Sequence, residues 1–186
     1  MLRRIPLGLL LICSVAHAEE RTVTGHGRAE GGRDPQQIAR LQAEEEATML
    51  SSTIPFRIDL EGEGQPFTTK VGPCHAKDVR AKPTGKNAWT VEVDAVVPAA
   101  VAERRAKLGE PRVGEHAIIH KLRGSARASA LKAIVLAANP CGSDVSVVSG
   151  TLDVVEMSEA KKLDGKSWLR VAAHITFDTC GDAREL

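Results

Sequence analysis

Histidine and cysteine are the residues of this 186-residue chain with the most evident capacity for metal or redox chemistry. His116 and His120 stand four positions apart, a spacing that would place two imidazoles on one face of a helix, where Zn or Cu could bind. The residues between them lack the glutamate of a metalloprotease motif, and residues 115–122 are predicted as a strand. In a strand, positions four apart lie about 13 Å from each other at ~3.3 Å per residue, too far to share an ion. The favoured interpretation is therefore solvated or partly buried histidines, with a metal site as the alternative.

Cys74 and His75 form a second possible pair for a soft metal or for redox chemistry, and His26 could supply a further ligand. Adjacent residues of an extended segment point to opposite sides, which argues against a shared ion. The chain has no C-x-x-C, no haem attachment motif and no G-x-S-x-G, and the glycines at positions 25 and 27 match no nucleotide-binding fingerprint. We therefore predict no catalytic residues and no cofactor. A small metal-binding protein remains the alternative function.

The first 18 residues are typical of a secretory signal. Arg3 and Arg4 precede an apolar run that is too short to span a bilayer, and residues 16–18 read Ala-His-Ala, a small-x-small cleavage site. Cleavage after Ala18 would place the remaining chain in the periplasm or outside the cell. The competing fate is lipidation of Cys13, and the large Ile12 before that cysteine argues against it.

Three cysteines remain after such cleavage, and in an oxidising compartment an odd number leaves one thiol over. Cys141 follows the predicted end of a helix and Cys180 follows the predicted end of the last strand. These two ends meet if the helix packs on its own sheet, so we predict a Cys141–Cys180 disulfide. Cys74 would then remain as a free thiol or pair with a second chain.

The predicted elements of the first half are a strand at 21–29, a helix at 34–51, strands at 56–60 and 67–71, a long loop, and a strand at 89–97. Asp34 and Pro35 are typical of a helix start. One face of this helix would carry Ala39, Ala43, Ala47 and Leu50. The glutamates at 44–46 are placed mostly on its far, solvated side.

The second half repeats this order after a connector at 99–114 that contains a short helix. A strand at 115–122, an Ala-rich helix at 126–138 and strands at 145–157 and 168–177 follow. Trp89 and Trp168 each open the last strand of their half. The prediction is an α+β protein of two tandem β-α-β-β units, 19–98 and 115–186, with helices packed on antiparallel sheet.

Composition and charge limit the classes of function. Hydrophobic residues make up 42% of the chain and aromatic residues only 3%, which indicates a globular core of aliphatic side chains and argues against an aromatic-lined ligand site. A formal net charge of +1 excludes a strongly basic nucleic-acid binder. No segment after residue 18 reaches the ~20 apolar residues of a membrane helix, so we predict no transmembrane segment.

The strand at 21–29 reads RTVTGHGRA and precedes a helix rich in Ala, Gln and Glu. Residues 21–97 thereby resemble the small exported domains of the SIMPL type and are similar to the N-terminal domain of flagellar assembly protein T. The resemblance implies a periplasmic binding or assembly domain, and it brings no catalytic motif. Cys74 and the long loop before Trp89 depart from that pattern.

Basic residues gather in the middle of the chain and could contact an envelope protein or an anionic envelope component. The favoured interpretation is a solvated connector balanced by the acidic N-terminal helix, although this run is the main candidate for an interaction surface. The predicted interaction surface comprises Arg104, Arg105, Lys107, Arg112, Lys121, Arg123 and Arg127. The sequence thus predicts a non-enzymatic binding or assembly protein of the cell envelope, with no nucleic acid as partner.

Overall fold

The computed structural model describes residues 21–63, 66–70, 76–111, 116–120, 126–142, 145–163 and 166–181. The fold is α+β, as predicted, with antiparallel sheets. The helices are α1 (Pro35–Ser51), α2 (Ala99–Leu108) and α3 (Ala126–Ala138). The strands are β1 (Thr22–Glu30), β2 (Ile54–Asp59), β3 (Phe67–Thr69), β4 (Ala76–Gly85), β5 (Ala88–Val96), β6 (His116–His120), β7 (Val147–Leu163) and β8 (Lys166–Gly181).

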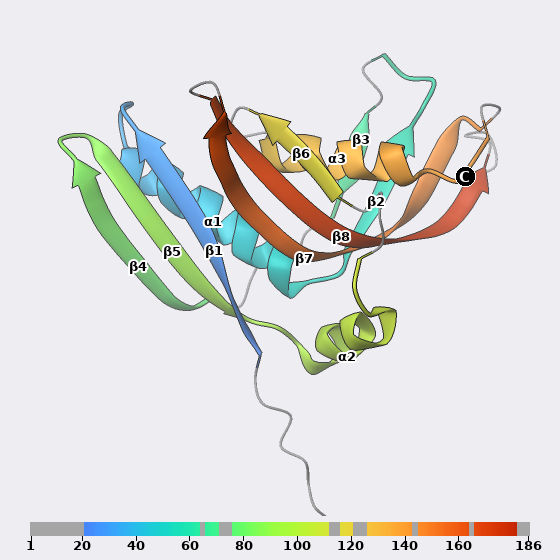
Figure 1. Ribbon diagram of the computed structural model, residues 1–186, viewed down its shortest axis with the longest axis horizontal. Helices are drawn as coiled ribbons and strands as arrows, with labels where there is room; N and C mark the ends of the chain where they lie inside the picture. The colour runs from blue at the N-terminus through green and yellow to red at the C-terminus, as the bar shows by residue number, and fades with distance from the viewer. Residues whose placement is uncertain are drawn as a thin grey trace, which may run out of the picture.

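The strands form two antiparallel sheets that lie next to each other (Figure 1). The first sheet has the order β1-β5-β4, and the second has the order β3-β2-β7-β8-β6. Helix α1 contacts β1 and β5 of the first sheet and β7 of the second. It therefore runs behind the line where the two sheets meet, while α3 packs on β6 and β8.

The two predicted units are interleaved in space. β2 and β3 come from the first unit, 19–98, yet β2 pairs with β7 of the second unit, with Ile54 opposite Leu152. The expected connector, 99–114, is therefore not a boundary between separate packing units. A physical reason lies in side-chain size, because Phe56 and Ile58 of β2 belong to the larger core beneath the second sheet. The core of the first sheet is built mainly from alanine and valine.

Helix α1 packs closely on β1 because both surfaces carry small residues. Asp34 begins the helix as predicted, with its side chain accepting a hydrogen bond from the Gln37 N–H at 3.0 Å. The expected buried face is confirmed, with Ala39, Ala43 and Ala47 fully buried and Leu50 nearly so. Glycines at positions 25 and 27 of β1 face this helix, where a Cβ atom on either would overlap the helix backbone. The G-x-G of β1 is therefore a packing motif.

The second sheet carries the larger core. Leu131, Ile134 and Val135 of α3 are fully buried against it. Phe56 lies over Gly150 of β7, and its ring packs against Phe67 and Phe177 at centroid distances of 6.4 and 5.9 Å. These three are all the phenylalanines in the chain, and they gather at the end of the second sheet far from the first.

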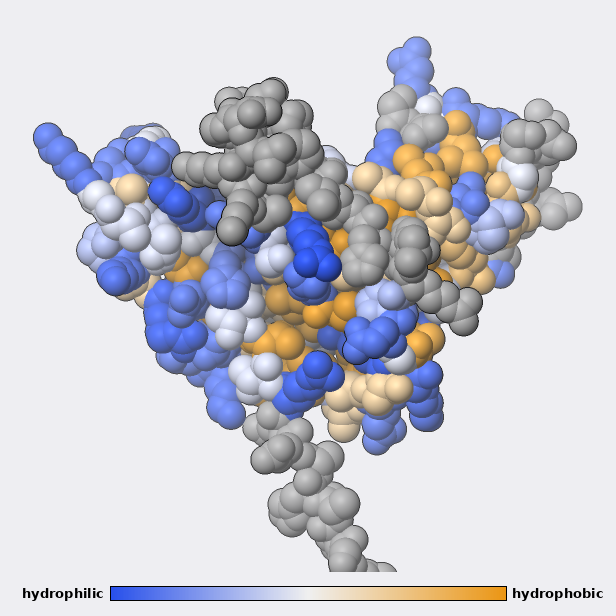
Figure 2. All heavy atoms as spheres, viewed as in Figure 1, coloured by the Kyte–Doolittle hydropathy of each residue, from blue (hydrophilic) through white to orange (hydrophobic). Residues whose placement is uncertain are grey.

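Strand β4 was not predicted, because its residues fall in the expected long loop. All ten of its residues are exposed, so no alternation of buried and exposed positions marks it in the sequence. It pairs with β5 at the outer edge of the first sheet. The face of this sheet that points away from α1 is mostly hydrophilic, as the left part of Figure 2 shows. Apolar surface gathers near the centre of the same view.

Candidate functional site

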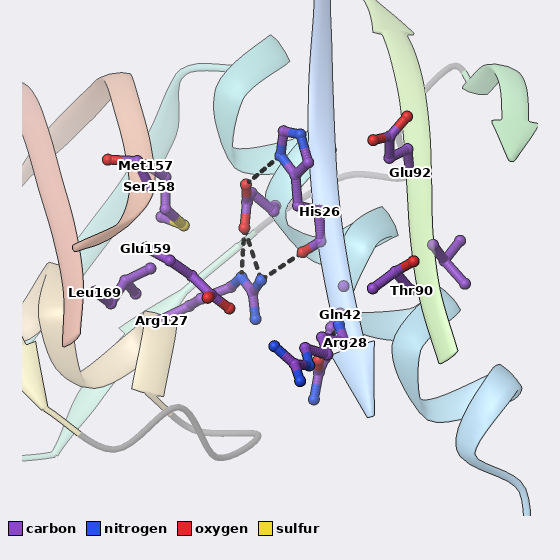
Figure 3. A pocket seen from close by; sticks show the side chains of 13 residues that line it. His26, Arg28, Gln42, Thr90, Glu92, Arg127, Met157, Ser158, Glu159 and Leu169 are labelled. Carbon is purple, nitrogen blue, oxygen red and sulfur yellow. Dashed lines mark hydrogen bonds and ion pairs between the residues drawn. The ribbon is translucent and has the colours of Figure 1, made fainter. Parts of the chain in front are cut away.

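A cleft of about 510 Å³ opens where β1 of the first sheet faces β7 and β8 of the second. Figure 3 shows Met157, Ser158 and Leu169 on the side of the second sheet, across from His26 on β1. The wall is partly polar and partly apolar. It is lined by His26, Gly27, Arg28, Gln42, Glu46, Thr90, Val91, Glu92, Arg127, Met157, Ser158, Glu159 and Leu169.

A buried carboxylate, Glu46, forms the centre of a polar network at this cleft. The Arg127 guanidinium donates to Glu46 Oε2 from Nη2 at 2.6 Å and from Nε at 3.2 Å. The His26 ring lies with Nδ1 3.2 Å from Glu46 Oε1. Both partners of the ion pair are buried, with side chains 4% exposed for Glu46 and 7% for Arg127, whereas the His26 side chain is 61% exposed. The carboxylate thus holds an accessible imidazole in a fixed orientation.

Local sequence explains how three elements bring these groups together. Alternation along β1 turns His26 away from the buried layer formed by its glycine neighbours. Glu46 lies one turn after Gln42 on the flank of α1 that faces the second sheet. Arg127 is the second residue of α3, where the helix dipole disfavours a cation, and Glu46 offsets that effect.

The placement of Glu46 corrects the expectation that residues 44–46 face solvent. Glu46 is only 3% exposed, because it follows Ala43 by three positions on the packed side of the helix. Burial also raises the pKa of the neighbouring Glu45 carboxyl; Arg127 lowers that pKa and Glu46 raises it. The acidic run is therefore part of the internal electrostatics of the cleft.

Backbone groups on the outer edge of β1 point away from the first sheet. The Arg21 carbonyl accepts a hydrogen bond from the N–H of Val97, next to β5, so the odd-numbered positions of β1 face β5. The even-numbered positions therefore direct their N–H and C=O groups outward. The His26 carbonyl accepts from Arg127 Nη2 at 2.7 Å. The Arg28 N–H donates to Gln42 Oε1 at 3.1 Å, so side chains occupy both positions.

The opposite wall of the cleft also has an open strand edge. β7 is 17 residues long, but β2 pairs only with its first part, from Val147 to Leu152. Within the described residues, no strand pairs with residues 153–163 on the side opposite β8. Residues 157–159 of this stretch line the cleft. Two strand edges that pair with no further strand in the described part of the chain thus border the same cavity.

A second hollow, of about 570 Å³, lies between the end of α2 and the sheets. Arg105, Val155 and Glu156 are among the residues that line it. Close to this lining, the fully buried Asp153 accepts from Arg104 Nε at 2.7 Å and from the Thr53 hydroxyl at 2.5 Å. Arg105 donates to the carbonyl oxygens of Leu50 and Ser52, at the end of α1. Burial lowers the pKa of Arg105, whereas Asp153 raises it. These contacts fasten α2 to α1 and β7.

The predicted basic interaction surface is only partly a surface. Arg105 and Arg127 are 8% and 6% exposed, so their guanidinium groups are internal. The expectation was wrong for these two because each finds buried oxygen acceptors on elements far away in the sequence. Arg104 is half-exposed and bound to Asp153, and Lys107 is exposed. The remaining members, Arg112, Lys121 and Arg123, lie outside the described residues.

Three of the histidines considered as alternative metal ligands, His26, His116 and His120, lie in the described part of the chain. His116 and His120 lie at the two ends of β6, a strand as predicted. Cys74 and His75 fall outside the described residues, as does the predicted signal at 1–18. Among the residues that the structure describes, no group of three or more His, Cys, Asp and Glu side chains could hold a metal ion.

The two cysteines predicted to pair lie within disulfide distance of each other, with Cα atoms 5.6 Å apart. Cys141 follows α3 and Cys180 stands near the end of β8, so the helix end and the strand end meet. Within the described residues, no helix is both long enough and apolar enough to cross a membrane.

The open face of the first sheet carries a separate polar network. Arg80 of β4 donates to Asp78, to Glu92 and, through both Nη atoms, to Asp94, at 2.6 and 2.9 Å for the last. The Arg80 hydrogen bonds and one from the Thr24 hydroxyl lower the pKa of Asp94 to about 2. Because Arg80 is exposed, this network is a solvated surface feature, and it meets the cleft only through Glu92.

No family model, curated protein or solved structure matches this chain. The likeness to SIMPL-type domains therefore stays a prediction. Sequence reasoning missed Gln42, Glu46 and the residues of β7 that line the cleft. The one available signal was a glutamate three positions after a residue of the alanine face.

Proposed function

We propose that the protein is an exported, non-enzymatic binding protein of the cell envelope, and that it binds a partner protein through the cleft between β1 and β7. The observation that carries this proposal is the cleft itself, which combines open strand edges, an apolar base and an accessible imidazole held by a buried ion pair. The SIMPL-type resemblance implies the same class of function.

Export is supported by two independent features. Residues 1–18 have the order of a secretory signal, and Cys141 and Cys180 lie at disulfide distance. Disulfides persist in oxidising compartments such as the periplasm and are rare in the cytosol.

A binding role is favoured over catalysis by the hydrogen bonds around the cleft. If Ser158 were a nucleophile for acyl transfer, its hydroxyl would need His26 as the base. The Ser158 hydroxyl instead donates to Glu156 at 3.0 Å. The internal positions of Arg105 and Arg127 favour a protein partner over an anionic surface, because two of the expected cations are unavailable to it.

Two variants test this proposal. Ser158→Trp would fill the cleft from β7, and Thr68→Trp introduces the same side chain at an exposed position of β3, outside the cleft. The exported chain is immobilised and exposed to envelope extract, and bound proteins are identified by mass spectrometry. We expect a partner that binds the wild type and Thr68→Trp and is lost with Ser158→Trp. Equal binding to all three chains, or an intact N-terminus in the cytosolic fraction only, would contradict the proposal.

A further inference from the structure

We propose that the occupant of the cleft is an extended polypeptide segment of another protein, which adds as a strand to the outer edge of β1. This inference rests on the proposed function and specifies the chemistry of the partner. Strand addition uses main-chain hydrogen bonds for affinity and alternate side chains for specificity.

The first observation is the pair of side-chain groups that already occupy the edge of β1. The His26 carbonyl and the Arg28 N–H flank Gly27 and point outward. In a parallel pair, one residue of an added strand supplies the N–H and the C=O that these two groups require. Arg127 Nη2 and Gln42 Oε1 now supply that donor and that acceptor. They take the places that the backbone of a neighbouring strand would take.

Both side chains can give up these places at little cost. Arg127 retains its two hydrogen bonds to Glu46 when it releases the His26 carbonyl, so no buried charge loses its partner. The Gln42 hydrogen bond is exposed, so its amide passes to water. Displacement therefore replaces one charge-assisted and one neutral hydrogen bond with two main-chain ones and leaves no buried charge unpaired.

The second observation is the edge of β7 that faces the same cavity. Residues 26–28 of β1 and 157–159 of β7 line it, which corresponds to about 10 Å of strand at ~3.3 Å per residue. A segment of about three residues that adds to β1 would therefore run past the open stretch of β7.

The walls also define the side chains that such a segment would carry. Val91, Met157 and Leu169 are 1%, 5% and 2% exposed and form the apolar part of the lining. Glu92 and Glu159 are exposed. Because side chains alternate along a strand, we expect one apolar residue that points inward between polar residues that point outward.

The other edge of the first sheet lacks these features. β4 is exposed along its whole length and carries Lys82, Pro83 and the charged Arg80. Charged side chains and proline on an edge strand discourage pairing with another chain. The edge of β1 is therefore the one suited to strand addition.

The test separates backbone recognition from side-chain recognition. A displayed library of random linear peptides is selected against the full exported chain, and affinities of the selected peptides are measured by fluorescence anisotropy. Arg28→Pro removes the outward N–H without removing a hydrogen bond to β5, and Arg28→Ala removes only the side chain. Glu30→Pro makes the same backbone change on β1 outside the cleft. Circular dichroism verifies that all variants fold.

We expect Arg28→Pro to weaken peptide binding about three- to tenfold, while Arg28→Ala and Glu30→Pro change it less than twofold. Gln42→Ala should strengthen binding, because it removes the group that competes for the Arg28 N–H. Methylation of alternate peptide nitrogens should abolish binding, because it removes the main-chain N–H groups that would pair with the edge of β1.

Three outcomes would overturn the inference. A library that yields no peptide excludes an extended segment as the occupant, and peptides that bind Arg28→Pro as well as the wild type exclude strand addition. Self-association of the chain that Arg28→Pro abolishes would assign the edge to a second copy. The Ser158→Trp comparison in envelope extract is independent of these results, so a cleft partner found there would stand even where strand addition fails.

Discussion

The buried pair Glu46–Arg127 makes a quantitative prediction about stability. Glu46→Ala would leave the Arg127 guanidinium only 6% exposed, with the His26 carbonyl as its remaining acceptor among the contacts described. Removal of one partner of a buried ion pair typically destabilises a protein by about 3–5 kcal/mol, because the other charge stays in a medium of low dielectric constant. For a chain of this size, that loss lowers Tm by about 6–20 °C.

Urea and thermal unfolding, followed by circular dichroism, measure this change. Glu44→Ala is the matched control, because Glu44 lies on the same helix in an exposed pair with Arg40. We expect the control to lose about 0.3–0.5 kcal/mol. Arg127→Ala should lose about as much stability as Glu46→Ala. The loss in the double variant should be about 2 kcal/mol smaller than the sum of the two single losses. Single losses below about 1 kcal/mol would contradict a buried ion pair, because they are typical of a pair on the surface.

Three further predictions concern packing, titration and the cysteines. Gly27→Ala should destabilise the chain by about 1–3 kcal/mol in urea unfolding, because the added Cβ overlaps the backbone of α1; an unchanged midpoint would contradict the close packing. The carboxyl of Asp94 should titrate by NMR near pH 2, and in Arg80→Ala its pKa should rise toward 3.8. Because the folded-state pKa is lowered, the stability from this contact is complete above about pH 4 and is lost as the pH falls toward 2. An Asp94 titration midpoint that is the same in Arg80→Ala and in the wild type would contradict this. Non-reducing peptide mapping should find Cys141 linked to Cys180, and this closure of a 39-residue separation is worth about 4 kcal/mol; alkylation of both thiols without reductant would exclude the bond.

The parts of the fold that sequence predicts well are those with a local physical signal. The alanine face of α1 repeats with the period of a helix, and Asp34 and Pro35 mark its start. Alternation of buried and exposed residues likewise marks β5. The fully exposed β4 has no such pattern, so its sequence predicts a loop.

The candidate site depends on contacts between distant segments, which a single sequence does not display. Arg127 and Glu46 are 81 positions apart. Each belongs to a charged run that the sequence predicts at the surface, and yet the two form an internal ion pair. The assignment of β2 to the second sheet is equally non-local, because side-chain volume in two competing cores decides it. The two glycines of β1 are visible in the sequence, but only their contact with α1 explains them.

Site-specific photocrosslinking in intact cells tests whether the cleft binds a partner protein. Benzoylphenylalanine is introduced at position 158, in the cleft, and at position 68, on exposed β3, in otherwise identical full-length chains. We expect position 158 to give an adduct with one exported protein, with the crosslink mapped by mass spectrometry to an extended segment of that protein. We expect no such adduct from position 68. Absence of an adduct at position 158, or the same adduct from both positions, would contradict a partner-binding role for the cleft.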